Sequence, residues 1–313
     1  MEPQKPRIEL YVKRPFGEKM NASFDFIKEN WKPMFKYITY LLLPLSLLQA
    51  LSLNGFMGSY MGIASEITKN ATDTTSVLSA LPMLGLNYSA MMLCYWVGAI
   101  LLTSLVYALM KTYSKREERL EGITLSELKP LLMHNVVAMI KMTLFVLLLV
   151  LIALGIVIGL AVLTPFTLIL TIPLLVACAV PLSLLSPVYL FEDISLMGAL
   201  QKAYRLGFAT WGGVFLITLV MGIIASILQG VIGTPWSVAL MVKNIFALSE
   251  GGDAAASSVG YSFVLYLFGI LQCYGAYLSG VFTILGVTYQ YGHASEVMDS
   301  VSVEDDIEQF EKL

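Results

Sequence analysis

Charged residues are scarce in this chain. Only 13% of its 313 residues are Asp, Glu, Lys or Arg, whereas soluble domains carry about 25%. Hydrophobic residues make up 57% of the chain, and its mean hydropathy is +0.76. This composition excludes a soluble globular domain. The apolar runs are continuous and do not alternate with polar residues, which excludes a membrane β-barrel. We therefore expect an all-α polytopic membrane protein.

Residues that carry metal or acid–base chemistry are also few. Cys94, Cys178 and Cys273 are isolated within apolar segments, without the spacing of a metal site or a disulfide framework. His134 and His293 are far apart in the sequence and have no metal-binding neighbours. No phosphate-binding loop, nucleophile elbow or paired-carboxylate motif is present. We expect no enzymatic activity, bound metal, cofactor or nucleic-acid partner.

The first twenty residues are polar and lack the apolar core of a secretory signal. A cleavable signal needs an apolar run followed by a small-residue cleavage site. We therefore expect the N-terminus to stay in the compartment where the chain is made.

The longest apolar stretch runs from Val136 to Leu190 and contains one charged residue, Lys141. A helix rises ~1.5 Å per residue, so this stretch far exceeds the ~30 Å hydrocarbon core and must cross it twice. Thr164-Pro165 marks the expected reversal, because proline suits the first turn of a new helix. The sequence therefore predicts a tight pair of helices here.

Hydropathy along the rest of the chain predicts six spans in total, arranged as three pairs. Their approximate bounds are 35–53, 88–110, 136–160, 166–190, 212–233 and 259–289. They form a membrane domain over 23–291, between a basic arm (1–22) and an acidic tail (292–313). Polar connections are expected at 54–87 and at 234–258, the second of which contains Thr234-Pro235-Trp236 and Gly251-Gly252.

Each pair of spans is preceded by an amphipathic stretch with apolar residues at helical spacing. These stretches start near Phe24, Leu125 and Leu196. Thr124 and Glu127 form a capping-box pattern at the start of the second stretch, and Pro33 marks an expected bend after the first. The repeat predicts a pseudo-three-fold bundle of six helices with three cytoplasmic surface helices.

The basic residues predict the orientation. Of the nineteen Lys and Arg residues, all but Lys69 and Lys243 lie near the termini or in the connections over 111–141 and 191–211. Basic residues concentrate on the cytoplasmic side of membrane proteins. We therefore expect both termini to be cytoplasmic.

No ionisable residue lies near the middle of an expected span, which argues against a proton- or sodium-coupled pump. The polar residues within spans are amides and hydroxyls, which serve either helix packing or a substrate lining. The binding candidates are the polar and aromatic residues Glu192, Arg205, Trp211, Gln229 and Gln272.

Three prolines, Pro173, Pro181 and Pro187, lie in the fourth expected span. Each removes a backbone hydrogen bond and can kink the helix, which exposes carbonyl groups. The kinks serve either packing or a hinge or cavity, and these prolines are the hinge candidates.

Two passages carry a family resemblance. Arg14-Pro-Phe-Gly-Glu18, followed by Phe24-Asp-Phe-Ile-Lys-Glu-Asn-Trp-Lys-Pro33, resembles the opening of uncharacterised bacterial six-helix inner-membrane proteins. Glu192-Asp-Ile-Ser-Leu-Met-Gly-Ala-Leu200, with Leu206 and Trp211, resembles the membrane domain attached to some glycerophosphodiester phosphodiesterases. The resemblance implies a bacterial inner-membrane location. It implies no activity, because the phosphodiesterase chemistry of those proteins resides in a separate soluble domain.

The leading hypothesis is a non-enzymatic inner-membrane protein that binds lipid-like molecules or a membrane partner. Its partners would be membrane lipids, with a protein docked through the acidic tail or the amphipathic helices. One alternative is a transporter or channel for a small uncharged or amphiphilic solute. Another is an accessory or regulatory subunit of a membrane complex. The sequence does not indicate an oligomeric state.

Overall fold

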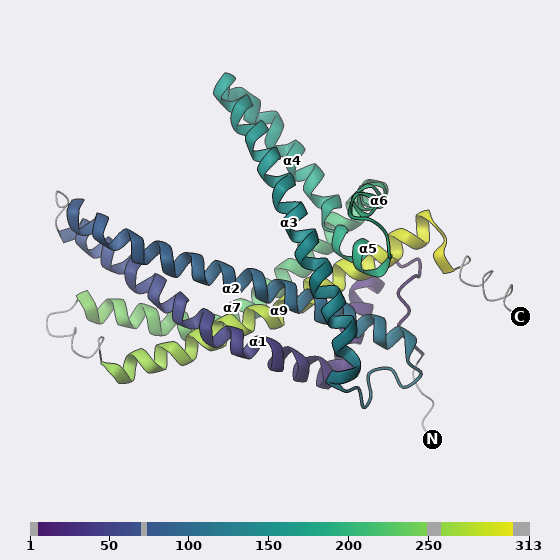
Figure 1. Cartoon of the computed structure of the whole chain (residues 1–313), viewed down its shortest axis with the longest axis horizontal. Helices are drawn as coiled ribbons and strands as arrows, with labels where there is room; N and C mark the ends of the chain where they lie inside the picture. The colour runs from purple at the N-terminus through teal and green to yellow at the C-terminus, as the bar shows by residue number, and fades with distance from the viewer. Residues whose placement is uncertain (1–5, 70–73, 249–257, 303–313) are drawn as a thin grey trace, which may run out of the picture. The chain divides into compact units, whose positions relative to one another are not determined.

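A computed structural model describes residues 6–69, 74–248 and 258–302 (Figure 1), and all regular structure within these ranges is helical. The predicted all-α class is therefore confirmed. Six helical segments are long and apolar enough to cross a membrane, as the sequence predicts. The elements are α1 (Phe16–Lys69), α2 (Thr74–Lys115), α3 (Leu125–Leu163), the 3-10 turn η1 (Pro165–Thr167), α4 (Leu168–Leu182), α5 (Leu185–Phe191), α6 (Leu196–Ala209), α7 (Trp211–Leu248) and α9 (Val259–Met298).

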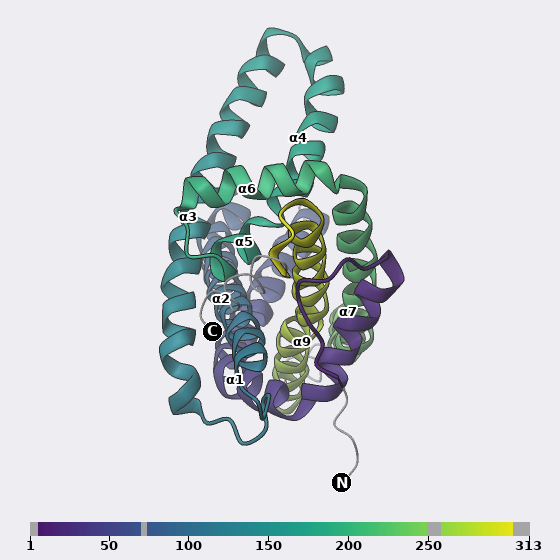
Figure 2. The same ribbon diagram turned by 90° about the vertical axis from the view of Figure 1, so that its right-hand side faces the viewer.

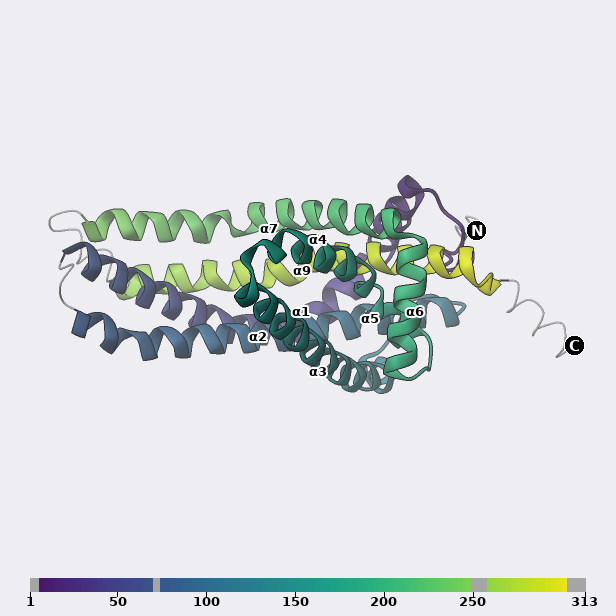
Figure 3. The same ribbon diagram turned by 90° about the horizontal axis from the view of Figure 1, so that it is seen from above.

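The chain folds into two compact units. Unit 1 comprises Met1–Phe35, Thr103–Ile223 and Val281–Leu313, and unit 2 comprises Lys36–Leu102 and Ile224–Gly280. Unit 1 therefore contains one end of each of α1, α2, α7 and α9, together with all of α3 to α6. Unit 2 is built from the other ends of the same four long helices, which lie side by side within it (Figure 3).

Tyr277 on α9 ties three helices of unit 2 together. Its hydroxyl donates to Gln49 Oε1 on α1 at 2.7 Å and lies 3.2 Å from the Cys94 carbonyl oxygen on α2. Gly98 on α2 admits the ring, because a Cβ at this position would overlap the Tyr277 side chain. Gly98 and Tyr277 thus bring α1, α2 and α9 into contact at this level.

The expected polar connection over 54–87 is wrong, because α1 continues to Lys69 and α2 begins at Thr74. The amides that suggested a loop have partners on the helices. Asn54 Oδ1 accepts the indole N–H of Trp236 at 2.9 Å, and Asn87 Nδ2 donates to the Met83 carbonyl at 3.0 Å. The Asn54 oxygen is therefore occupied by a partner on another helix, and the Asn87 amide shares a carbonyl of its own helix.

The expected loop at Thr234-Pro235-Trp236 is wrong as well, since all three residues lie inside α7. The Thr234 hydroxyl donates to the Gly230 carbonyl at 2.8 Å, one turn earlier on the same helix. Proline within a membrane-crossing helix is tolerated where neighbouring groups satisfy the freed backbone.

Of the three expected surface helices, only α6 is separate. The first stretch is part of α1, which begins at Phe16 and is non-helical inside only at Asn30 (φ −112°, ψ 19°). This distortion lies one turn before Pro33, whose ring lacks an N–H and crowds the preceding turn. The second stretch is continuous with α3, where the Thr124 side chain accepts the Glu127 N–H at 3.4 Å, so the predicted N-cap is confirmed.

The boundaries of both terminal segments also need correction. The basic arm expected over 1–22 is helical from Phe16 onward, and the acidic tail expected from residue 292 begins with the last turns of α9, which ends at Met298. Residues 303–313 lie outside the described part of the chain. Docking of a partner through the acidic tail therefore stays a prediction.

The predicted reversal between the third and fourth spans is confirmed. Thr164 is extended (φ −157°, ψ 121°), and Pro165 opens η1, so the backbone turns at this dipeptide. Figure 2 shows α3 and α4 as a hairpin joined at its tip. The fourth span is not one helix: α4 ends at Leu182, and α5 begins at Leu185.

Candidate functional site

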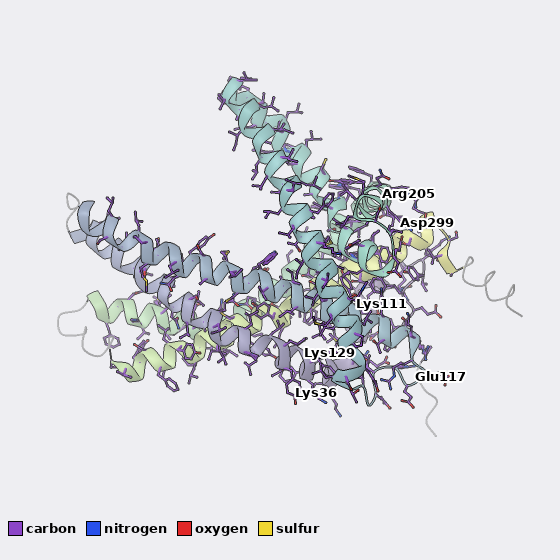
Figure 4. All side chains as sticks on the ribbon, in the orientation of Figure 1. Lys36, Lys111, Glu117, Lys129, Arg205 and Asp299 are labelled. Carbon is purple, nitrogen blue, oxygen red and sulfur yellow. The ribbon has the colours of Figure 1, made fainter. Side chains whose placement is uncertain are left out.

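A network of ion pairs joins three segments of unit 1. Lys202 Nζ on α6 lies 2.8 Å from Glu192 Oε2, just after α5, and 3.0 Å from Asp299 Oδ2, just after α9. Arg205 donates to Asp299 Oδ1 at 2.6 Å, and these two residues lie together in Figure 4. The side chains of Glu192, Lys202 and Asp299 are 20%, 22% and 15% exposed. The network therefore fixes α6 to the ends of two other helices.

The local sequence of α6 explains why its cations meet these carboxylates. Ser195 caps the helix by accepting the Gly198 N–H at 3.2 Å. Residues that are three positions apart lie on neighbouring parts of a helix surface, which places Lys202 and Arg205 together. The opposite face is buried and consists largely of small residues: Ala199, Ala203, Leu206 and Gly207.

Tyr291 on α9 extends the network toward the N-terminus. Its hydroxyl donates to Glu192 Oε1 at 2.8 Å and lies 3.2 Å from the Tyr11 hydroxyl. The Tyr291 side chain is fully buried, so its hydroxyl needs these partners. Glu192 is thus held on both carboxylate oxygens, one by Lys202 and one by Tyr291.

Lys202 makes this network sensitive to alkaline pH. Burial lowers the pKa of Lys202, but hydrogen bonds to Glu192 and Asp299 and their negative charges together raise it above its ordinary value of 10.5. A lysine with a raised folded-state pKa adds stability below the unfolded pKa, and this is lost as pH rises through the folded pKa. We expect wild-type protein to lose more thermal stability above about pH 10.5 than Lys202→Met, measured by circular dichroism in detergent. Parallel pH curves for the two proteins would contradict this role.

Residues 7–14, which we name the N-terminal strap, cross the end of α2. Arg7 donates to the Ser114 carbonyl at 3.3 Å, and the Ile8 N–H donates to the Tyr113 hydroxyl at 3.2 Å. These contacts fix residues 7 and 8, which have no regular secondary structure.

The N-terminal strap also contacts α9 directly. A Cβ at Gly292 would overlap the backbone carbonyl of Leu10, so glycine permits this close approach. The Arg14 N–H donates to His293 Nδ1 at 3.1 Å. The strap is therefore held against successive residues of α9 by its backbone as well as by Tyr11.

Two of the predicted residues, Trp211 and Pro181, concern the same backbone carbonyl near the end of α4. The indole N–H of Trp211 donates to the Ala177 carbonyl at 3.0 Å. In a regular helix this carbonyl would accept from residue 181, but Pro181 has no N–H to donate. Trp211 therefore supplies the hydrogen bond that Pro181 removes. The other hinge candidates differ: Pro173 is exposed within α4, and Pro187 is buried in the first turn of α5.

The two predicted glutamines lie together in unit 2. Gln229 Nε2 on α7 donates to the backbone carbonyl of Gln272 on α9 at 3.0 Å. The side-chain oxygens of both residues are buried and, among the described residues, have no hydrogen-bond donor. Gly233 leaves space for the Gln272 amide, since a Cβ there would overlap its oxygen. These residues form a contact separate from the network of Glu192 and Arg205 in unit 1.

Sequence reasoning missed Lys202, Asp299 and Tyr291 as parts of the network. Lys202 carried a weak signal, namely its spacing to Arg205, whereas Asp299 looked like one of many tail acids. Within the described ranges, no group of three or more His, Cys, Asp and Glu side chains could hold a metal ion.

No family model, curated protein or solved structure matches this chain. The resemblance to the phosphodiesterase-associated membrane domain therefore stays a prediction. The function must be argued from the geometry of the chain itself.

Proposed function

We propose that this protein is a non-enzymatic multi-pass membrane protein that binds phospholipid acyl chains along the α3–α4 hairpin. The observation that carries the proposal is the exposure of this hairpin. The most apolar window of α3 has a mean hydropathy of 3.3 and no buried residue, whereas the corresponding windows of α2 and α9 are 50% buried.

The tip of the hairpin consists of large apolar side chains without protein cover. Val162, Leu163 and Phe166 are 81%, 81% and 80% exposed. Each such side chain would cost about 1.5–3 kcal/mol if it stayed in water. Acyl chains remove this cost, so a lipid environment on all sides suits the hairpin.

One face of α3 is shaped for a close neighbour. A Cβ added at Gly155 or Gly159 would meet no other atom within 4 Å. Small residues at this spacing let another chain approach the helix backbone closely. An acyl chain lying along this face would fill the space.

Helix α6 supports the proposal at the base of the hairpin, where it packs against α4 and α5 and runs across them (Figure 2). Its outer face carries exposed apolar residues, with Met197 54% and Phe208 53% exposed, beside the exposed Gln201 and Arg205. Trp211 stacks on Phe215 with ring centroids 5.2 Å apart. A helix with exposed apolar and aromatic residues beside basic ones suits the headgroup layer of a bilayer.

Lipid removal tests the proposal. We expect phospholipid to co-purify at one or more molecules per chain, measured by native mass spectrometry. Delipidation should speed hydrogen exchange of the α3 amides more than those of α2 and α9, because the most apolar window of α3 has no buried residue and theirs are half buried. Gly155→Leu/Gly159→Leu should retain less lipid than the wild type. Gly58→Leu is the control, because a Cβ added there also meets no atom within 4 Å, and it should retain as much lipid as the wild type. A delipidated protein with unchanged exchange and stability would argue against the proposal.

A second candidate function is transport of a small uncharged solute, favoured by the buried amide oxygens of Gln229 and Gln272 that lack donors. A hydroxyl or amide group of a solute would satisfy them. We expect glycerol to enter proteoliposomes that contain the wild-type protein, and we expect this entry to be lost with Gln229→Leu/Gln272→Leu. Flux equal to that of protein-free liposomes would remove this candidate.

A further inference from the structure

Lys19, near the start of α1, is a buried cation without a counter-ion. Lys19 is 4% exposed, and its Nζ donates to Gln290 Oε1 at 2.7 Å. None of the ion pairs in the described part of the chain includes Lys19. A neutral amide oxygen does not balance an ammonium charge, and burying an uncompensated charge is costly.

Arg14 contacts the same part of α9 as Lys19 does. Its backbone N–H donates to His293 Nδ1 at 3.1 Å, and His293 lies one turn after Gln290, the partner of Lys19. Lys13 precedes Arg14 in the sequence. The Arg14 guanidinium donates to the Leu10 and Glu9 backbone carbonyls at 3.4 and 2.7 Å and so keeps its charge unneutralised.

Among the described residues, no carboxylate forms an ion pair with Lys13, Arg14 or Lys19. The acidic side chains of the same stretch, Glu9 and Glu18, are exposed, and no ion pair within the described ranges includes either of them. By contrast, the cations of the α6 network each face a carboxylate. The cluster formed by Lys13, Arg14, Lys19 and His293, which we name the basic cluster, is therefore positive as a whole.

The basic cluster presents hydrogen-bond donors as well as charge. His293 Nδ1 accepts the Arg14 N–H, so the proton of the neutral imidazole resides on Nε2 as a donor. Lys19 has three N–H groups and uses one on Gln290. α1 begins at Phe16, and the N–H groups of its first turn lie at the positive end of the helix dipole.

We propose that Lys19, at the start of α1, and His293, near the end of α9, bind a phosphate-class oxyanion, which is either the phosphate of a lipid headgroup or free phosphate. The anion would neutralise Lys19 and accept from the donors that surround it, because charged N–H donors bind phosphate oxygens strongly. This site goes beyond the proposed acyl-chain surface. It involves α1 and α9 and not the hairpin, and it stands even if the hairpin retains no lipid.

The test measures binding to the full-length protein in detergent by isothermal titration calorimetry, with three probes at fixed ionic strength. The probes are inorganic phosphate, phosphatidic acid in mixed micelles, and diacylglycerol with the same acyl chains. We expect Lys19→Met to weaken binding of the phosphate-bearing probe about tenfold or more, because a hydrogen bond to a charged group contributes at least that factor. Lys28→Met is the matched control, since Lys28 is an exposed lysine on the same helix.

The probes separate the two sources of phosphate. Binding of inorganic phosphate identifies a free-anion site, and binding of phosphatidic acid alone identifies a lipid headgroup site. Equal binding by the wild type and Lys19→Met, or no binding of either phosphate probe, would overturn the proposal. Diacylglycerol binding without phosphate-dependent binding would leave the acyl-chain proposal standing and remove this one.

Gln290→Glu provides a second variant in case Lys19→Met folds poorly. It places a carboxylate where the amide oxygen now lies 2.7 Å from Lys19 Nζ. We expect this variant to be at least as thermally stable as the wild type and to lose the response to phosphate, because the counter-ion is then built in. A variant that still binds phosphate with wild-type affinity would contradict the site.

Discussion

Gly207→Ala is expected to lower the free energy of unfolding by about 2–3 kcal/mol, the upper range for overpacking a core. A Cβ at this position would lie 2.5 Å from Pro181 Cβ and 2.6 Å from Pro181 Cα. The neighbouring atom is backbone of α4, which cannot rotate away as a flexible side chain does. The measurement is unfolding in mixed micelles with increasing SDS, followed by circular dichroism.

Gly212→Ala is the matched control for this prediction. Gly212 lies close by at the start of α7, and a Cβ there would meet no other atom within 4 Å. Alanine at this exposed helical position should be neutral or slightly stabilising. If both variants had the same stability, close packing of α6 on Pro181 would not be the reason for glycine at 207.

Trp211→Phe is expected to destabilise the protein by about 1 kcal/mol, the lower range for a buried carbonyl without a donor, because this hydrogen bond is partly buried. Phenylalanine keeps the aromatic ring but cannot donate to the Ala177 carbonyl. Pro181→Ala should reduce that cost, because alanine at 181 returns the backbone N–H that the Ala177 carbonyl lacks. The two single variants and the double variant form a cycle measured by the same SDS titration.

The cycle distinguishes the hydrogen bond from simple packing of the indole. If Trp211→Phe costs the same with proline and with alanine at position 181, the indole N–H does not replace the missing helical hydrogen bond. A smaller cost with alanine at position 181 supports the compensation.

Much of the fold could be predicted because hydropathy is a local property. The six apolar segments, the reversal at Thr164-Pro165 and the cap at Thr124 each depend on residues that are near in sequence. The positions of helix ends are harder to predict from the sequence. Asn54 and Asn87 are typical of loops, and only tertiary or backbone partners reveal that they lie inside helices.

The candidate sites were only partly predictable for the same physical reason. Glu192 and Arg205 could be chosen from charge and spacing, but their shared partners come from elsewhere in the chain. Asp299 is 94 residues from Arg205, and Gln290 is 271 residues from Lys19. No local pattern in a single sequence encodes pairs at such separations.

The contact of the N-terminal strap with α9 has a consequence for the order of assembly during synthesis. Tyr11 and Tyr291 are 280 residues apart, so the strap emerges from the ribosome long before its binding surface exists. Unit 1 is likewise completed only by residues from Val281 onward. Its contacts with the end of α2 can form early, but its contacts with α9 must wait until the last helix has been inserted, so docking on α9 closes the fold. A nascent chain stopped before Gly292 would expose residues 10–14 of the strap to added protease, and release of the finished chain would protect them.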